Sequence, residues 1–569
     1  MNTAQRWRLK IERVLWRLDQ PQALRMAMWF MPVVFGLLSI AMRQDSNWDL
    51  RNYHLYNPFA WLNGKVGLDL APAQMQTYFN PTIDLLYYGL DKIAPPRVLG
   101  FVMGAIHGLN FVLLVAIARA VLPVARNGRQ IRLPLCLAMA GMLGPGFIAQ
   151  LGNTMGDNLT ALFILGAVWL VLRHWEAFAQ ARGTAQVLLA GLVMGLGVGL
   201  KLTNGIYAPA LCVALLLVPA AFAVRIQMAF LFGVGVLAGM AITAGHWFWK
   251  MWTLFGNPLY PQFNTLFHSP MAAATGIADL RFMPHDLVEK VLWPFIFAMH
   301  PERVSEIRLS MVAWPILYIA FIAFIFTTLR RHSAVAGTDV SERSRATALL
   351  AFFALSYLVW LNLFGIYRYL VLLELVTPLV VWLIAQRLFS RQLAGKVAGL
   401  LILLIVVSSV PSKNWGRVGW GKQTLRAEVT AIANPAQSLV LTVHVDPPMG
   451  WIATYYPPDL AFVSLVPGFE SERYLQRVTE MMAQRSGPFY VLLSDSGAGV
   501  DSRMSAQRTQ SGIARDAQIN QDAGRVLAAR GLQFAAAACV RHPAYVGNDR
   551  LYYRMCPVTP LASTPAGQP

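Results

Sequence analysis

Acidic and aromatic residues cluster shortly after the first apolar run, in the stretch Asp45-Ser-Asn-Trp-Asp49-Leu-Arg-Asn-Tyr53-His54-Leu-Tyr56. Asp45 and Asp49 are four positions apart, so a helix would place both carboxylates on one face, and Asp49, Tyr53 and Tyr56 would also share a face. A carboxylate beside aromatic rings at a membrane surface suits the binding and deprotonation of a sugar hydroxyl. The same residue types also cap helices and form interfacial aromatic belts, and both interpretations remain open.

Charged residues recur at the ends of later apolar runs, namely Asp157, Lys201 and Arg368. Charged groups this close to hydrocarbon are functional by default. The structural alternatives are that Lys201 reaches headgroups, that Arg368 pairs with a carboxylate and that Asp157 caps a helix. Glu374 is six positions from Arg368 and so lies on another helical face, whereas Tyr367, seven positions away, shares the face of Glu374.

The segment after the first acidic stretch, from Leu68 to Pro81, has many hydrogen-bonding groups, Asn80 among them, and few charges. This composition fits a sugar-binding surface or an ordered loop. Residues 82–94 are amphipathic and are expected to lie along the membrane surface. No Walker loop, dinucleotide fingerprint or metal-binding helix motif is found in the sequence, and we expect neither a cofactor nor a metal.

Composition indicates the elements that position these residues. Of the 569 residues, 56% are hydrophobic and only 13% are charged, against about 25% charged residues in soluble domains. The apolar residues form runs of about membrane-spanning length, roughly 20 residues. The sequence therefore predicts an all-α polytopic membrane bundle of about eleven helices, near 26–43, 98–122, 133–150, 158–173, 185–200, 204–221, 226–246, 309–329, 346–366, 369–386 and 397–411. Residues 287–300 are too short to cross and are expected to be re-entrant or interfacial.

The net charge of +19 follows the predicted topology. With a cytoplasmic N-terminus, the predicted cytoplasmic segments carry most of the excess of arginine and lysine, as the positive-inside rule requires. The charge therefore needs no nucleic-acid partner. We expect a multi-pass protein of the bacterial inner membrane, with the lipid bilayer as its surroundings and the segment after residue 412 outside the cytoplasm.

This topology predicts a membrane domain over residues 1–411 with two large outer loops, 44–97 and 247–308. It also predicts an extracytoplasmic α/β domain over 412–556 and a disordered tail over 557–569. Within the α/β domain we expect strands at 438–444 and 489–494, helices at 471–485 and 519–530, a mobile loop at 495–518, and a closing strand pair at 533–541 and 549–556. An oxidising compartment would allow a disulfide between Cys539 and Cys556 across that pair.

Several of these stretches resemble the GT-C glycosyltransferases, and most closely the bacterial members that use polyprenyl-phosphate sugars. The resemblance covers roughly residues 26–390, and its weight lies in the order of the motifs. The matching motifs are Asp49-Leu-Arg-Asn-Tyr53-His-Leu-Tyr56 with Leu62-Asn-Gly64, Asn153-Thr-Met-Gly-Asp157-Asn158, Gly199-Leu-Lys201-Leu-Thr203-Asn204, Gly256-Asn257-Pro258-Leu-Tyr260-Pro261 and Tyr367-Arg368-Tyr369.

The resemblance implies an inverting transfer of sugar from a polyprenyl-phosphate donor to a glycan, lipid or protein acceptor. It implies that Asp49 is the catalytic base, with Asp45 as the rival position. Arg368, Lys201 and Tyr367 are then expected to bind the donor phosphate. The residues expected to contact substrate are Asp157, Tyr53, Asn80 and His54. The alternative functions are a transporter or flippase of lipid-linked saccharides, a polysaccharide polymerase or ligase, and a non-enzymatic assembly protein.

Overall fold

A computed structural model describes residues 17–122, 131–275, 279–330, 340–409, 413–498, 500–501 and 504–561. Residues 1–16 of the predicted cytoplasmic N-terminus and residues 562–569 of the predicted tail lie outside these residues. The chain divides into two compact units, and each is described by itself. We call them the helical unit (Met1–Met42, Gly100–Gly245 and Asp279–Trp415) and the mixed unit (Arg43–Leu99, His246–Ala278 and Gly416–Pro569).

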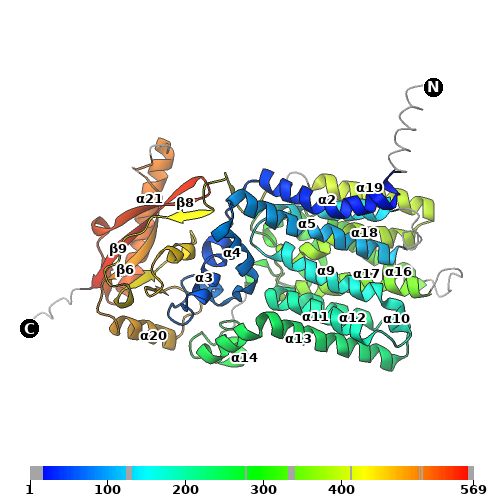
Figure 1. Cartoon of the computed structure of the whole chain (residues 1–569), viewed down its shortest axis with the longest axis horizontal. Helices are drawn as coiled ribbons and strands as arrows, with labels where there is room; N and C mark the ends of the chain where they lie inside the picture. The colour runs from blue at the N-terminus through cyan, green and yellow to red at the C-terminus, as the bar shows by residue number, and fades with distance from the viewer. Residues whose placement is uncertain are drawn as a thin grey trace, which may run out of the picture. The chain divides into compact units, whose positions relative to one another are not determined.

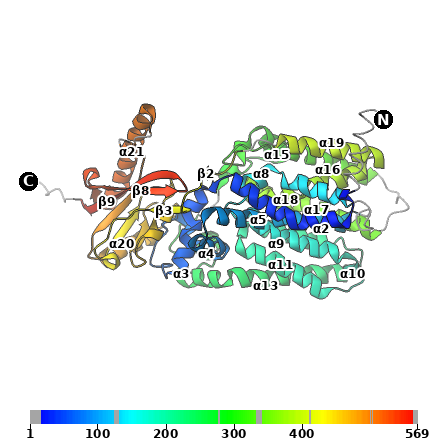
Figure 2. The same cartoon turned by 45° about the horizontal axis from the view of Figure 1, so that its top comes forward.

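Long apolar helices lying side by side make up the helical unit (Figure 1, Figure 2). Two of them, α5 and α13, continue into the mixed unit. The helices are α2 (Pro21–Ala41), α5 (Pro96–Val121), α7 (Arg132–Met142), α8 (Pro145–Ala149), α9 (Asp157–Arg173), α10 (Trp175–Ala179), α11 (Thr184–Leu200), η4 (Leu202–Ile206), α12 (Tyr207–Leu215), α13 (Phe222–Phe255), α15 (Leu287–Met299), η6 (Pro301–Arg303), α16 (Ala313–Arg330), η7 (Tyr367–Leu370), α17 (Val340–Leu363), α18 (Val371–Leu388) and α19 (Arg391–Ser408).

Seven helices within the described ranges are long and apolar enough to cross a membrane, and three shorter apolar helices accompany them. A multi-pass bundle is therefore consistent with the structure, whereas the count of eleven spans is not confirmed. The predicted span 133–150 is one place where the structure differs from the prediction. Pro145 begins a new helix, so the apolar run divides into α7 and the short α8. With 11 residues, α7 falls well short of the roughly 20 needed to span.

Arginine side chains tie the helix ends together at one end of the helical unit, where Arg387 of α18 donates to the Arg343 carbonyl oxygen (3.1 Å). Arg345 of α17 donates to the Ala120 carbonyl oxygen at the end of α5 (2.8 Å) and to Glu176 of α10 (2.7 Å). Trp175 Nε1 donates to Ser344 Oγ (2.8 Å). Because α17 begins here and α9 ends here, the start of α9 and the ends of α11 and α17 lie at the opposite end of the unit.

Glycines spaced four residues apart allow α11 and α13 to pack closely. A Cβ atom added to Gly191 would lie 2.1 Å from the Phe232 carbonyl oxygen, and one added to Gly195 would lie 2.0 Å from that of Val236. A Cβ on Gly239 of α13 would meet the Leu192 carbonyl oxygen at 2.2 Å. Small residues at this spacing let two membrane helices approach with backbone nearly in contact. This contact fixes the position of α11, whose last residue precedes Lys201.

A mixed sheet with the strand order β3-β8-β9-β6-β4-β5 forms the centre of the mixed unit, and β7 also pairs with β9. Strand β4 is parallel to both β5 and β6, and the remaining pairs are antiparallel. A separate two-stranded sheet joins β1 and β2. The strands are β1 (Gln44–Asp45), β2 (Arg417–Val418), β3 (Leu425–Ala427), β4 (Leu439–Thr442), β5 (Ala461–Ser464), β6 (Phe489–Asp495), β7 (Leu532–Phe534), β8 (Val540–Val546) and β9 (Asp549–Pro560).

Helices and tight turns from three distant segments surround this sheet. They are η1 (Leu50–His54), a π-helix, α3 (Tyr56–Leu62), η2 (Gln74–Tyr78), η3 (Pro81–Asp84), α4 (Leu85–Ile93), α14 (Asn264–Phe267), η8 (Pro435–Gln437), η9 (Gly450–Tyr455), α20 (Glu472–Ala483), α21 (Ala506–Ala528) and η10 (Ala536–Ala538). Two of the predicted boundaries are wrong. Helix α21 begins at Ala506, inside the predicted loop 495–518, and β9 extends to Pro560, inside the predicted tail. The start of α21 was not predicted because the helix has few apolar residues and buries only three of its residues.

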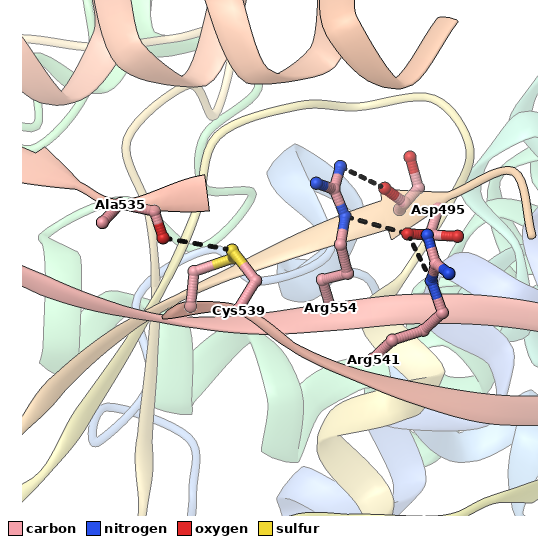
Figure 3. The surroundings of a disulfide bond; sticks show 7 residues. Asp495, Ala535, Cys539, Arg541 and Arg554 are labelled. Atoms are coloured by element: carbon pink, nitrogen blue, oxygen red, sulfur yellow. Dashed lines mark hydrogen bonds and ion pairs between the residues drawn. A yellow bond between two sulfur atoms is a disulfide. The ribbon is translucent and has the colours of Figure 1, made fainter. Parts of the chain in front are cut away.

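The disulfide considered from the sequence is present between Cys539 and Cys556, at the start of the β8–β9 pair. Figure 3 shows that two arginines converge on one carboxylate beside it. Arg541 Nε donates to Asp495 Oδ2 (2.9 Å), and Arg554 Nε lies 3.0 Å from the same oxygen. The Asp495 side chain is fully buried, and the paired cations compensate its desolvation.

A buried ion pair within the first outer segment connects that segment to the sheet of the mixed unit through its hydrogen bonds. Lys65 is fully buried, and its Nζ lies 3.3 Å from Asp69 Oδ1 and donates to the Leu460 carbonyl oxygen (2.6 Å). Asp69 also accepts from Tyr56 (2.5 Å) and from the Phe462 backbone (2.9 Å). Burial raises the pKa of the Asp69 carboxyl, and Lys65 and the hydrogen bonds oppose this rise. The segment that carries η1 is therefore anchored directly beside β5.

The glycine contact predicts the effect of one added methyl group. We expect Gly195→Ala to lower the free energy of unfolding by about 1–3 kcal/mol, because the new Cβ would overlap the α13 backbone. Gly233→Ala on α13 is the matched control, since a Cβ there meets nothing within 4 Å. Thermal unfolding of both purified variants in detergent measures the difference. Equal melting temperatures would mean that α11 and α13 do not pack as described.

Candidate functional site

Two cations predicted to bind phosphate lie around one aromatic ring in the helical unit. Lys201 caps the C-terminal end of α11, and Arg368 lies in η7. Lys201 Nζ is 5.4 Å from the centroid of the Tyr369 ring, and Arg368 Cζ is also 5.4 Å from it. Tyr207 donates to the Tyr369 carbonyl oxygen (2.5 Å). We call Lys201, Arg368 and Tyr369 the cation site.

Asp157 neutralises one of these cations. Its Oδ1 accepts a hydrogen bond of 2.5 Å from Lys201 Nζ, which also donates to the Met155 carbonyl oxygen (2.7 Å). The side chains of Lys201 and Asp157 are 16% and 6% exposed, so the pair is largely removed from water. The interpretation of Asp157 as a helix cap is wrong, because Gly156 is the N-cap and Asp157 is the first residue of α9. An acidic first residue also complements the helix dipole.

Arg368 is half-buried and acts on a second carboxylate. The pKa of Asp279 is lowered mainly by its hydrogen bond with Arg281, and the field of Arg368 contributes to the same shift. Asp279 Oδ2 and Arg281 form an exposed ion pair of 2.6 Å.

Tyr367 and Glu374 form a buried network beside the cation site. Tyr367 donates to Glu374 Oε2 (2.7 Å) and accepts from Trp314 Nε1 (3.2 Å). Glu374 also accepts from the backbone nitrogens of Gly146 (3.1 Å) and Phe147 (3.0 Å) at the start of α8. The helical spacing predicted that Tyr367 and Glu374 share a face, and in the structure the two side chains are hydrogen-bonded. The hydroxyl of Tyr367 is thus engaged inside the bundle, where it fixes the turn that carries Arg368.

The two acids of the first outer segment belong to the mixed unit and differ in their surroundings. Asp45 lies in β1, and its carboxylate accepts from the backbone nitrogen (3.1 Å) and the side-chain amide (2.9 Å) of Asn47. Asp49 directly precedes the π-helix η1 and is 7% exposed. The predicted common helical face for Asp45 and Asp49 is therefore wrong, because Asp45 is held in extended backbone by pairing with β2.

The predicted substrate-contacting residues of the mixed unit make different contacts. Tyr53 packs against His54 (ring centroids 4.1 Å apart) and against Phe79 (5.5 Å). His54 Nδ1 lies 2.6 Å from Asp84 Oδ1. Asn80 caps the turn η3 by accepting from the backbone nitrogen of the residue two positions later (3.1 Å). The sequence did not single out Asp84, because no spacing rule relates residues 30 positions apart in an irregular segment.

No protein-family model matches the sequence, and no curated protein matches it. Among solved structures, the crystal structure of the Archaeoglobus fulgidus oligosaccharyltransferase in its apo form aligns with 83% of this chain and 70% of that chain, at 13% sequence identity and a TM-score of 0.40.

The Lys201–Asp157 pair predicts a recoverable loss of stability. We expect Lys201→Met to lower the free energy of unfolding by about 3–5 kcal/mol, because it leaves a buried carboxylate without its cation. The double variant Lys201→Met with Asp157→Leu is expected to recover most of that loss. Thermal unfolding in detergent measures both. If the double variant were no more stable than the single one, the pair would not account for the loss.

Proposed function

We propose that this chain is a GT-C-type glycosyltransferase that moves a sugar from a polyprenyl-phosphate donor to an extracytoplasmic glycan, lipid or protein acceptor. The observation that supports this most is the cation site. Lys201 and Arg368, far apart in the sequence, meet around Tyr369 at the end of apolar helices. A lipid phosphate has its negative charge at the same boundary, where its apolar tail ends.

The cation site fits the leaving group of the transfer. As the bond between the sugar and the phosphate breaks, negative charge grows on the phosphate oxygens. Cations held where water is scarce stabilise that charge more than they would in bulk water. The planar guanidinium of Arg368 offers two donors to one phosphate, and Lys201 adds a point charge. Asp157 keeps Lys201 satisfied in the free protein, and the phosphate would compete with it for the ammonium group.

Asp49 is our proposed base. The acceptor oxygen attacks the anomeric carbon, its proton passes to the Asp49 carboxylate, and the bond to the polyprenyl phosphate breaks in the same step, which inverts the anomeric centre. Asp45 is the weaker candidate, because the hydrogen bonds from Asn47 favour a fixed, structural carboxylate. Tyr53 and His54 are proposed to contact sugar. Tyr367 is proposed to position Arg368, and Asn80 to hold its own turn.

One observation supports an extracytoplasmic position for the mixed unit, and another supports the orientation of the helical unit. The Cys539–Cys556 disulfide fits an oxidising compartment such as the bacterial periplasm. Arg345 and Arg387, at one end of the helical unit, fit a cytoplasmic membrane face. We therefore propose that the protein lies in the bacterial inner membrane, with the arginine-rich end inside and the cation site at the outer leaflet.

Removing the base tests the chemistry. We expect Asp49→Asn, which keeps the side-chain shape, to lower the rate of sugar transfer by roughly 100-fold to 10,000-fold. Transfer from a radiolabelled polyprenyl-phosphate sugar by the purified variant measures this rate. Asp459→Asn, an exposed acid of the mixed unit, is the control and should transfer at the wild-type rate. A wild-type rate for Asp49→Asn would exclude Asp49 as the base.

Removing a cation tests phosphate binding separately. We expect Arg368→Ala to weaken the binding of polyprenyl phosphate by about 10-fold to 100-fold, as loss of a charge-assisted hydrogen bond of roughly 1.5–3 kcal/mol requires. Arg173→Ala, at the opposite end of the helical unit, is the control. Its guanidinium lies over Trp169, 5.2 Å from the ring centroid. Unchanged affinity in Arg368→Ala would rule out the phosphate role.

A further inference from the structure

An open cleft of about 650 Å³ lies in the mixed unit, between the segment 264–274 and the first turns of α20. We call it the α20 cleft. Every residue that lines it belongs to the mixed unit. Its volume falls in the range of ligand-binding pockets, roughly 300–1,000 Å³. None of the residues to which we assign a role in sugar transfer lines it, so the α20 cleft is separate from the residues of the reaction.

The first wall of the α20 cleft is built around one buried asparagine. Asn264 is 1% exposed, and its amide nitrogen donates to three backbone carbonyl oxygens, those of Ser269 (3.0 Å), Ala272 (3.0 Å) and Ala273 (3.1 Å). Its amide oxygen accepts from the backbone nitrogen of Ser269 (2.8 Å). His268 adopts a left-handed backbone (φ 53°), a sparsely populated conformation that persists only where the surrounding structure maintains it. The wall is therefore a fixed loop.

The Gly-Asn-Pro motif at 256–258, which the proposed reaction does not use, supports this wall. Asn257 is fully buried, and its Nδ2 donates to the Gln262 carbonyl oxygen (2.9 Å). This bond holds the turn that leads into α14. The hydroxyl of Tyr260, in the same turn, donates to the Met271 carbonyl oxygen (2.8 Å). The motif thus has a structural role in shaping the α20 cleft.

The second wall is the start of α20, and two hydrogen bonds join it to the first. Ser471 is the N-cap of α20, and its Oγ accepts from the backbone nitrogen of Tyr474 (3.1 Å). The same hydroxyl donates to the Pro270 carbonyl oxygen (2.6 Å). The backbone nitrogen of Ala273 donates to the Phe469 carbonyl oxygen (2.9 Å). Because both walls are fixed and joined, the α20 cleft is formed before any ligand enters.

Exposed polar side chains face solvent on both sides of the α20 cleft. His268 belongs to the first wall, Glu472 and Gln476 belong to the second, and all three are exposed. A neutral imidazole and an amide each offer both donors and acceptors, and a carboxylate accepts. A sugar hydroxyl both donates and accepts, so it can form hydrogen bonds with each of these groups.

The charges of the lining disfavour an ionic ligand. One acid, Glu472, and one base, Arg473, line the α20 cleft, so its formal charge is zero when His268 is neutral. Arg473 already forms an ion pair of 2.5 Å with Glu480. An anionic ligand would therefore find no unpaired arginine or lysine among the lining residues. An uncharged ligand avoids this cost.

The shape and the residue types of the lining disfavour a peptide or a lipid. The described residues that line the α20 cleft include no large apolar side chain, which a lipid tail or a helical or proline-rich peptide would need. A peptide that binds as an added strand needs the edge of a sheet. The walls here are a loop and a helix. An uncharged, hydroxyl-rich chain fits the lining better than either.

We infer that the α20 cleft binds an uncharged oligosaccharide segment of the acceptor, with Gln476, Glu472 and His268 as its hydrogen-bonding groups. This inference rests on the proposed function and deepens it, because it names a glycan as the acceptor. Since no residue of the reaction lines the α20 cleft, the segment held there is a part of the acceptor that does not react. Such binding is the same in the ground state and the transition state, so it lowers the KM for acceptor and leaves kcat unchanged.

Two variants remove hydrogen-bonding groups from the α20 cleft, one from each wall. They are Gln476→Ala and His268→Gly, both at exposed positions, and glycine suits the left-handed backbone of residue 268. Gln484→Ala is the matched control, because Gln484 is an exposed glutamine at the C-cap of the same helix and does not line the cleft. The full-length proteins are purified in detergent, and equal melting temperatures establish that the variants are folded.

Binding is measured on an array that displays neutral oligosaccharides, acidic oligosaccharides and unstructured peptides. We expect the wild-type protein to bind neutral oligosaccharides, and each cleft variant to weaken this binding by about 3-fold to 10-fold, as the loss of neutral hydrogen bonds requires. Gln484→Ala should bind as the wild type does. The bound oligosaccharide is then offered as acceptor with a radiolabelled polyprenyl-phosphate hexose. Each cleft variant should raise its KM by the same factor and leave kcat unchanged.

The inference is overturned if the wild-type protein binds polyprenyl phosphate but no neutral oligosaccharide, or binds peptides or acidic glycans in their place. It is also overturned if both folded cleft variants bind the oligosaccharide as tightly as the wild type. A bound oligosaccharide that receives no sugar overturns its assignment as the acceptor. The proposed function itself fails if the wild-type protein binds no polyprenyl phosphate, a measurement that does not involve the α20 cleft. The two failures are therefore distinguishable.

Discussion

Lys201 and Arg368 place two positive charges at the edge of an apolar helix bundle, and the surrounding helices must hold these charges. Lys201 ends an apolar helix, and an ammonium group there needs partners inside the protein. The structure supplies the Asp157 carboxylate, the Met155 carbonyl oxygen and the face of Tyr369. Arg368 shares the same ring. Such arrangements are costly to build and are kept where an ion or a charged substrate must be handled.

The neighbouring helices hold these charges in place. The Tyr367–Glu374 hydrogen bond fixes the turn before α18, and the backbone nitrogens of α8 add two more bonds to the same carboxylate. Glycine packing against α13 fixes α11 in the same unit. In the mixed unit, the Lys65–Asp69 pair holds the first outer segment in place. The irregular segment that carries Asp49 and His54 is thereby held beside a regular sheet.

The sequence alone predicted the features that depend on local composition. The apolar runs predicted a bundle of long apolar helices, of which seven in the described ranges could span a membrane and the predicted eleven are not confirmed. Helical spacing predicted that Tyr367 and Glu374 share a face. Lys201 and Arg368 stood out because charge is rare beside hydrocarbon. Contacts between residues that lie far apart in the sequence were not predictable. Nothing in the sequence relates Asp84 to His54, since an irregular segment has no period from which to infer contacts. The helix α21 was missed in part because its first turns bury almost nothing.

We propose that Lys201 and Arg368 bind the phosphate of a lipid carrier, and an experimental density map of the purified protein with bound polyprenyl phosphate is the decisive measurement. We expect phosphate density within hydrogen-bond distance of the Arg368 guanidinium and the Lys201 ammonium group, with the apolar tail along the helices. Phosphate density elsewhere, with both cations unchanged around Tyr369, would rule out this site.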